Sequence, residues 1–115
     1  TWRTNHRGRI AIHAGASRES LLIMRRWMER YGVEPPAESE LPFGAIVATA
    51  ELVACERVGE LPADLRGHAF TEGPWCWRLA DVQPVETPIP CRGMQGLWPV
   101  PREIAMQLDV ELSPV

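Results

Sequence analysis

Three stretches of the chain distribute apolar residues in the way that β-strands do. Residues 7–14 alternate, with Ile10 and Ile12 on one face, which predicts a half-buried strand. Residues 44–55 form the longest apolar run, and their small and β-branched side chains favour a central strand packed on both faces. Residues 75–83 alternate again, which predicts a third strand that ends before a group of prolines, Pro84, Pro88 and Pro90.

Residues 17–31 have the periodicity of an amphipathic helix. Ser17 is suited to cap its N-terminus, and Gly32 stands where a C′ glycine ends many helices. The apolar positions of this segment recur at helical spacing and fall on one face, namely Leu21, Met24, Met28 and Tyr31. We expect this face to pack against the core.

The remaining segments are richer in proline and glycine. The pattern of residues 61–73 predicts a loop with one helical turn. Pro101 is expected to begin a short helix that runs to Leu108, and residues 110–112 are expected to form a last strand. Strands therefore dominate, with one clear helix. This pattern predicts a single α+β domain over residues 1–115, built as a small β-barrel or a curled mixed sheet, with the helix at about residues 17–31 covering one opening.

The composition is that of an ordinary globular protein of 115 residues and 12.9 kDa, with 45% hydrophobic and 23% charged residues. This balance excludes an intrinsically disordered chain. The cysteines form no C-x-x-C pair, which argues against a disulfide scaffold or a zinc site and favours a reducing, cytoplasmic compartment. No apolar run is long enough to span a membrane, so we expect no membrane partner, and no metal or cofactor.

The formal charge of −3 conceals an asymmetry along the chain. Residues 1–30 hold seven Arg and two Glu, a balance of +5, whereas residues 31–115 hold five Arg and 13 acids, a balance of −8. An anionic partner of the N-terminal part is the first implication. All basic residues are Arg, so a mechanism that needs a Lys nucleophile or base is excluded for this chain.

The chain offers a small set of candidate ligand-binding residues. Arginines near the first strand suit phosphate groups, and tryptophans suit an unpaired base, which gives the set Trp2, Arg3, Arg7, Arg9 and Trp75. His13 and Glu51 would contact the polar edge of that base. Glu51 interrupts an apolar strand, so it should pair with an Arg or line a cavity. The alternatives are a solvated arginine face, a structural histidine, and core positions for Trp77 and Trp98.

Four segments in order resemble the ASCH domain, a branch of the PUA-like superfamily. They are residues 2–14 (WRTNHRGRIAIHA), 43–53 (FGAIVATAELV), 75–82 (WCWRLADV) and 88–98 (PIPCRGMQGLW). The chain departs from the pattern at its start, because the Gly-x-Lys-x-x-Glu-x-Arg segment that precedes the first Trp in that family is missing. If a barrel strand is lost with that segment, an exposed strand edge would favour a homodimer.

The resemblance implies binding of RNA, another single-stranded nucleic acid or a modified nucleoside in a basic cleft of the barrel. An alternative from the same family is an amidohydrolase that deacetylates 4-acetylcytidine-type nucleosides. Without the family's Lys, only Glu51 and His13 could serve as catalytic groups, so we expect binding rather than catalysis from this chain as given. A third alternative is a protein–protein interaction module whose basic face meets an acidic partner.

Overall fold

The helices and strands were assigned in a computed structural model that describes residues 2–15, 19–67, 71 and 73–114. The strands are β1 (Gly8–Ala14), β2 (Ala45–Arg57) and β3 (Trp75–Pro90). The helices are α1 (Glu19–Arg30), α2 (Ala63–Arg66) and α3 (Arg102–Ala105), with 3-10 turns η1 (Glu38–Glu40) and η2 (Val58–Glu60). The predicted α+β class is confirmed. No helix within the described part of the chain is long and apolar enough to cross a membrane.

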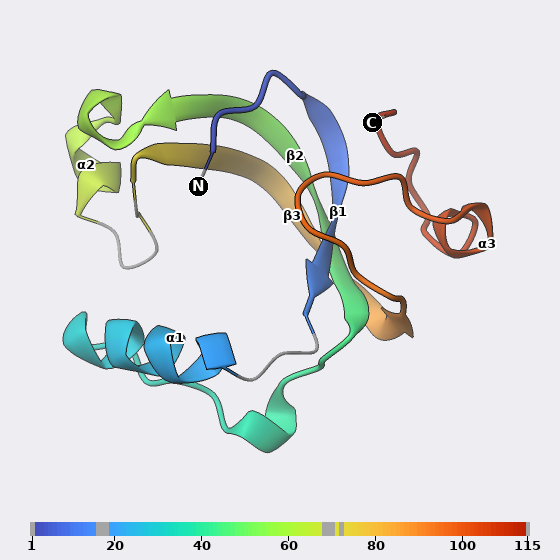
Figure 1. Cartoon of the computed structure of the whole chain (residues 1–115), viewed down its shortest axis with the longest axis horizontal. Helices are drawn as coiled ribbons and strands as arrows, with labels where there is room; N and C mark the ends of the chain where they lie inside the picture. The colour runs from blue at the N-terminus through green and yellow to red at the C-terminus, as the bar shows by residue number, and fades with distance from the viewer. Residues whose placement is uncertain (1, 16–18, 68–70, 72, 115) are drawn as a thin grey trace.

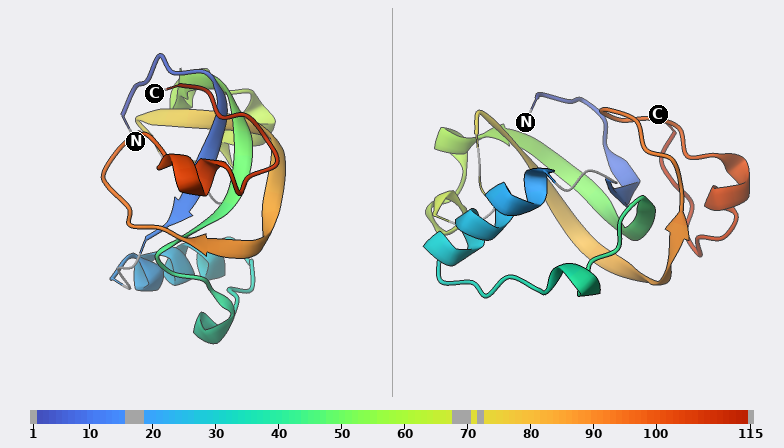
Figure 2. Two further views of the ribbon diagram at one scale, coloured as in Figure 1. Left: turned by 90° about the vertical axis from the view of Figure 1, so that its right-hand side faces the viewer. Right: turned by 60° about the horizontal axis from the view of Figure 1, so that its bottom comes forward.

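The strands form a three-stranded sheet in the order β1-β2-β3, with both pairs antiparallel rather than mixed. β2 is the central strand, as its apolar run predicts, and most of its first half is buried. The sheet is strongly curved, and α1 lies on the side towards which it curves (Figures 1 and 2). Segment 2–7 passes from the start of β1 back towards the start of β3 (Figure 1). Segment 2–7 therefore lies near the end of the sheet at which β3 begins (Figure 1).

The third strand is longer than predicted, and the expectation that Pro84 ends it is wrong. β3 continues to Pro90, with Pro84 opposite Ala48 and Pro90 opposite Ala45. A proline has no N–H to donate to a sheet, so it is tolerated only in edge strands and at irregularities. β3 is an edge strand of this sheet, and its pairing with β2 shifts register at three places. Both conditions that admit proline are therefore present.

The predicted helix is confirmed as α1, and its C-terminus ends as Gly32 indicates. Gly32 has a φ of 72°, and the N–H of Val33 donates to the carbonyl of Met28 at 2.8 Å, the bond of a Schellman motif. The proposed cap Ser17 lies outside the described residues. Only part of the expected apolar face is buried, because Met28 is 8% exposed whereas Tyr31 is 45% exposed.

The C-terminal segment contributes to the core without forming the expected strand. α3 ends at Ala105, short of Leu108, and residues 110–112 are not a strand. The core instead centres on Ile46, Ile89 and Cys91, on which Trp98, Val100, Ile104 and Leu108 pack. Apolar side chains of this segment are thus partly buried by packing on the core of the sheet. An alternating sequence pattern does not distinguish this packing from pairing as a strand.

Candidate functional site

The structure divides the predicted ligand-binding residues among separate places. Trp2, Arg3 and Trp75 come together at the start of β3. Arg9 and Glu51 face each other across β1 and β2. His13 lies further along β1, against the segment that follows β3. The predicted set is therefore not one site.

The first group surrounds two tryptophans of β3, and we call it the aromatic–arginine cluster (Trp2, Arg3, Arg57, Trp75 and Trp77). The indole N–H of Trp77 donates to the carbonyl oxygen of Trp2 at 2.9 Å. The two rings meet edge to face, with centroids 5.3 Å apart and planes at 82°. Trp2 remains 52% exposed, so one aromatic surface of the cluster is open to solvent.

Two guanidinium groups lie near the single ring of Trp75. The central carbon of Arg57 is 5.0 Å from the ring centroid, and that of Arg3 is 5.7 Å from it. These distances are typical of cation–π contacts. Arg57 is directly opposite Trp75 in the β2–β3 ladder, which places both side chains on one face. Sequence reasoning missed Arg57, because only the register of these strands reveals it.

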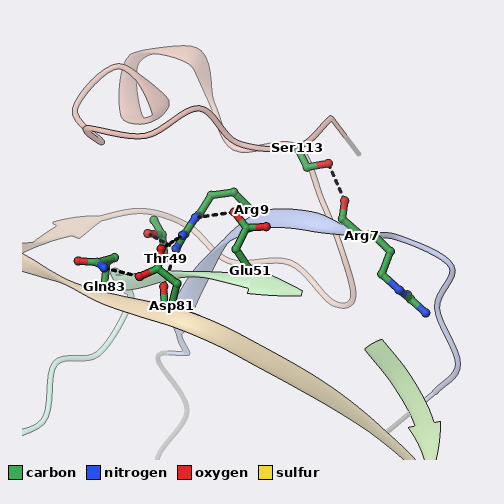
Figure 3. A network of polar contacts seen from close by, with 7 residues as sticks. All are labelled: Arg7, Arg9, Thr49, Glu51, Asp81, Gln83 and Ser113. Carbon is green, nitrogen blue, oxygen red and sulfur yellow. Dashed lines mark hydrogen bonds and ion pairs between the residues drawn. The ribbon is translucent and has the colours of Figure 1, made fainter. Parts of the chain in front are cut away.

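Arg9 belongs to a different environment, the inner ion cluster (Arg9, Thr49, Glu51 and Asp81), which ties all three strands together (Figure 3). Its Nε donates to Glu51 at 3.2 Å and one Nη to the hydroxyl of Thr49 at 3.3 Å. Both Nη atoms also donate to Asp81, one to the backbone carbonyl at 2.8 Å and the other to the carboxylate. Arg9 is only 9% exposed, and these bonds leave little donor capacity for a phosphate.

Asp81 owes its position to the irregularity of β3. It has a φ of 47°, a left-handed conformation that aspartate tolerates better than most residues. It lies where the pairing shifts from Thr49 opposite Gln83 to Glu51 opposite Ala80. Hydrogen bonds from Gln83 and Arg9, together with the charge of Arg9, hold the pKa of this carboxyl below its usual value. Asp81 thus acts as the second counter-ion of Arg9.

His13 is fixed by the segment after β3. Its Nε2 is 2.6 Å from the carbonyl oxygen of Cys91, and its ring meets the ring of Trp98 edge to face at 5.7 Å. A carbonyl can only accept, so Nε2 carries the proton and Nδ1 is left as an acceptor in the neutral ring. A Cβ atom at position 93 would come within 2.8 Å of that Nδ1, so only a glycine fits against this edge of the imidazole.

A cavity of about 850 Å³ lies between β1, the start of β3 and the C-terminal segment. Its wall is mainly apolar and includes Ile12, His13, Trp77 and Trp98. A second cavity, of about 700 Å³, lies beside Asp81 and is lined largely by the end of β3 and residues 107–110. Glu51 is not among the lining residues described for either cavity.

The remaining predicted residue, Arg7, is engaged by its own loop. Its guanidinium donates to the carbonyl oxygens of Thr4 at 3.1 Å and His6 at 2.7 Å. Ser113 approaches from the other end of the chain, donating its hydroxyl to the Arg7 carbonyl and its N–H to the Arg9 carbonyl, both at 2.8 Å (Figure 3). Part of the outer edge of β1 is therefore covered by this contact, whereas β3 has no strand beyond it among the described residues.

The two candidate catalytic groups are not brought to one point. Glu51 is opposite Arg9, and His13 lies four positions further along β1, which corresponds to about 13 Å of strand. The carboxylate of Glu51 also accepts from Arg9, which occupies one of its oxygens. Among the described residues, no three His, Cys, Asp or Glu side chains converge as metal ligands.

Comparison of the chain with known protein families finds no family that matches it, and comparison with curated proteins finds no match either. The resemblance to ASCH domains therefore stays a prediction from the sequence. The geometry of the site is the remaining basis for a functional argument.

Proposed function

We propose that this protein binds single-stranded RNA or a nucleotide-like ligand, as a PUA-like ASCH domain whose curved sheet belongs to a small barrel. The observation that carries the proposal is the position of Trp77. This residue lines the cavity of about 850 Å³ and also holds the half-exposed Trp2 against its ring. A half-open, mainly apolar pocket and an exposed stacking surface are thus joined by one side chain.

The chemistry of these two parts suits consecutive units of a single strand. The cavity has the size of small-molecule pockets, which run from about 300 to 1,000 Å³, and its apolar and aromatic wall suits a flat base. The Nδ1 atom of His13 would accept from an N–H group on the edge of that base. Trp2 would stack a neighbouring base, a contact that contributes about 1–3 kcal/mol in single-strand binding proteins.

A single strand fits this arrangement better than a duplex does. An A-form duplex hides its base edges in a deep and narrow groove, so its bases could neither enter the cavity nor stack on Trp2. The arginines of the aromatic–arginine cluster add the positive charge that a phosphate backbone requires. The acidic remainder of the chain would restrict binding to this surface.

The proposal is tested by the fluorescence anisotropy of a labelled single-stranded RNA titrated with the protein. We expect saturable binding that weakens steeply with salt, and an affinity at least fivefold lower for Trp2→Ala, from the loss of one stacked base. Ile23→Ala is the matched control, because Ile23 is 62% exposed on α1 and outside the cluster. Absence of binding at low salt, or equal losses in the two variants, would contradict the proposal.

A further inference from the structure

The arrangement of Arg3 and Arg57 around Trp75 places two like charges beside one ring. Both guanidinium carbons lie within 6 Å of the same centroid. The two guanidinium carbons can therefore be no more than about 11 Å apart, and like charges at or below that distance repel one another weakly at 0.1 M salt. The attraction of the ring for each cation holds both guanidinium groups beside it in spite of that repulsion.

Neither arginine has a carboxylate that would neutralise it among the described residues. The ion pairs of this part of the chain join Arg9 to two acids and Arg78 to Glu56 at 3.0 Å. Glu56 is the chain neighbour of Arg57, yet it is engaged on Arg78. No hydrogen bond from either side chain of the Arg3–Arg57 pair occurs in the described part of the molecule, and both residues are exposed. Within the described part of the molecule, the side-chain N–H groups of both arginines therefore have no acceptor.

We infer that Arg3 and Arg57 jointly hold a phosphate group beside Trp75. The ring orients both guanidinium groups before the ligand arrives, which lowers the entropy cost of ordering two long side chains. A guanidinium presents paired N–H donors that match the oxygens of a phosphate, and the ligand's negative charge removes the repulsion between the cations. The site thus lies at the start of β3, and none of these three residues lines the cavity of about 850 Å³.

The phosphate could come from an RNA backbone or from a free phosphate ion. Its assignment to a phosphodiester of RNA rests on the proposed function, whereas the anion site stands on the geometry alone. The shared chemistry is a tetrahedral oxyanion with at least one negative charge. The experiment therefore has one arm for each source.

In the first arm, inorganic phosphate is titrated into the isotopically labelled protein while the arginine Nε–H signals are followed by NMR. We expect the Arg3 and Arg57 signals to shift together and saturably, and the signal of Arg30, exposed on α1, to follow only the ionic strength. In Arg57→Ala the response of Arg3 should weaken about tenfold in apparent affinity. Linear shifts like those of Arg30, or an Arg3 response unchanged by the substitution, would overturn the inference.

In the second arm, RNA is compared with an oligonucleotide of the same sequence carrying uncharged methylphosphonate linkages. Arg57→Ala should weaken RNA binding about tenfold and leave binding of the uncharged strand unchanged, with Arg30→Ala as the control. Equal weakening for both strands would show that Arg57 does not contact a phosphate and would overturn the inference. Saturable phosphate binding without any RNA binding would support the anion site and reject the proposed function. Arg57→Lys, which keeps the charge, checks that a loss is not a folding defect.

Discussion

Arg3 and Arg9 are six positions apart in the sequence, yet the structure uses them in opposite ways. Arg9 is buried in the inner ion cluster, where its guanidinium is bound by Thr49, Glu51 and Asp81. Arg3 is exposed in the aromatic–arginine cluster, where the ring of Trp75 faces it and no described residue accepts a hydrogen bond from its side chain. Arginine content alone therefore does not locate an anion site. The arginines best suited to bind an anion are those that pair with no carboxylate among the described residues.

The largest effect should come from removing the buried arginine. Arg9→Ala leaves Thr49 and the carbonyl of Asp81 without a donor and removes the positive charge that faces Glu51. We expect the free energy of unfolding in urea to fall by about 2 kcal/mol, a value reduced because the carboxylate partners are partly exposed to water. RNA affinity of the folded variant should fall less than in Trp2→Ala, because Arg9 is one of many residues that line the cavity and its donors are bound by its neighbours. A strong loss of RNA binding with little loss of stability would reverse the contrast between the two arginines.

Substitution in the aromatic–arginine cluster should weaken RNA binding more than it lowers stability. Trp75→Leu removes the ring that orients Arg3 and Arg57, so RNA affinity should fall about tenfold. Anisotropy titrations at several salt concentrations would show whether the salt dependence decreases as well. If affinity persists in this variant, the ring is not what prepares the arginines for the anion.

Acid should act on the inner ion cluster through Asp81. Its pKa is lowered in the folded protein, so its contribution to stability is present above the unfolded-state value and is lost as the pH falls through the lowered folded value. The difference in unfolding free energy between the wild type and Asp81→Asn should therefore be largest near neutral pH and shrink below about pH 4. Asparagine also tolerates the positive φ at this position, which isolates the charge. If the difference in unfolding free energy between the two proteins does not depend on pH, the charge of Asp81 is not its cause.

The smallest effect on stability should come from Arg57→Ala. Arg57 is exposed and makes no ion pair with a described residue, so its removal should change the unfolding free energy by less than about 0.5 kcal/mol. At low salt the variant should be slightly stabilised, because repulsion of Arg3 is relieved. Thermal unfolding at two salt concentrations measures both effects. A clear loss of stability would show that Arg57 contributes to the stability of the fold and would contradict this prediction.

The sequence was sufficient to predict β1, β2 and α1, because each depends on a local pattern of apolar residues. It also indicated that Glu51 needs an arginine or a cavity, and the structure supplies Arg9. The roles of Arg57 and Asp81 were not predictable in this way. Arg57 depends on the register of β2 against β3, and Asp81 depends on a left-handed residue within a strand, which no periodicity reveals. The prediction that Pro84 ends the third strand was wrong for a related reason. A strand tolerates proline where it lies at the edge of a sheet, and the sequence does not show that β3 is an edge strand.

The contact between Ser113 and Arg7 has a consequence for the order of folding. These residues are 106 positions apart, whereas β2 and β3 are adjacent along the chain. Loop-closure entropy grows with the length of chain enclosed, so the hairpin of β2 and β3 should form before β1 docks. The hydrogen bonds of Ser113 to Arg7, just before β1, and to Arg9 within β1 can form only after β1 is in place. Substitutions at Ser113 should therefore accelerate unfolding while leaving the rate of folding almost unchanged.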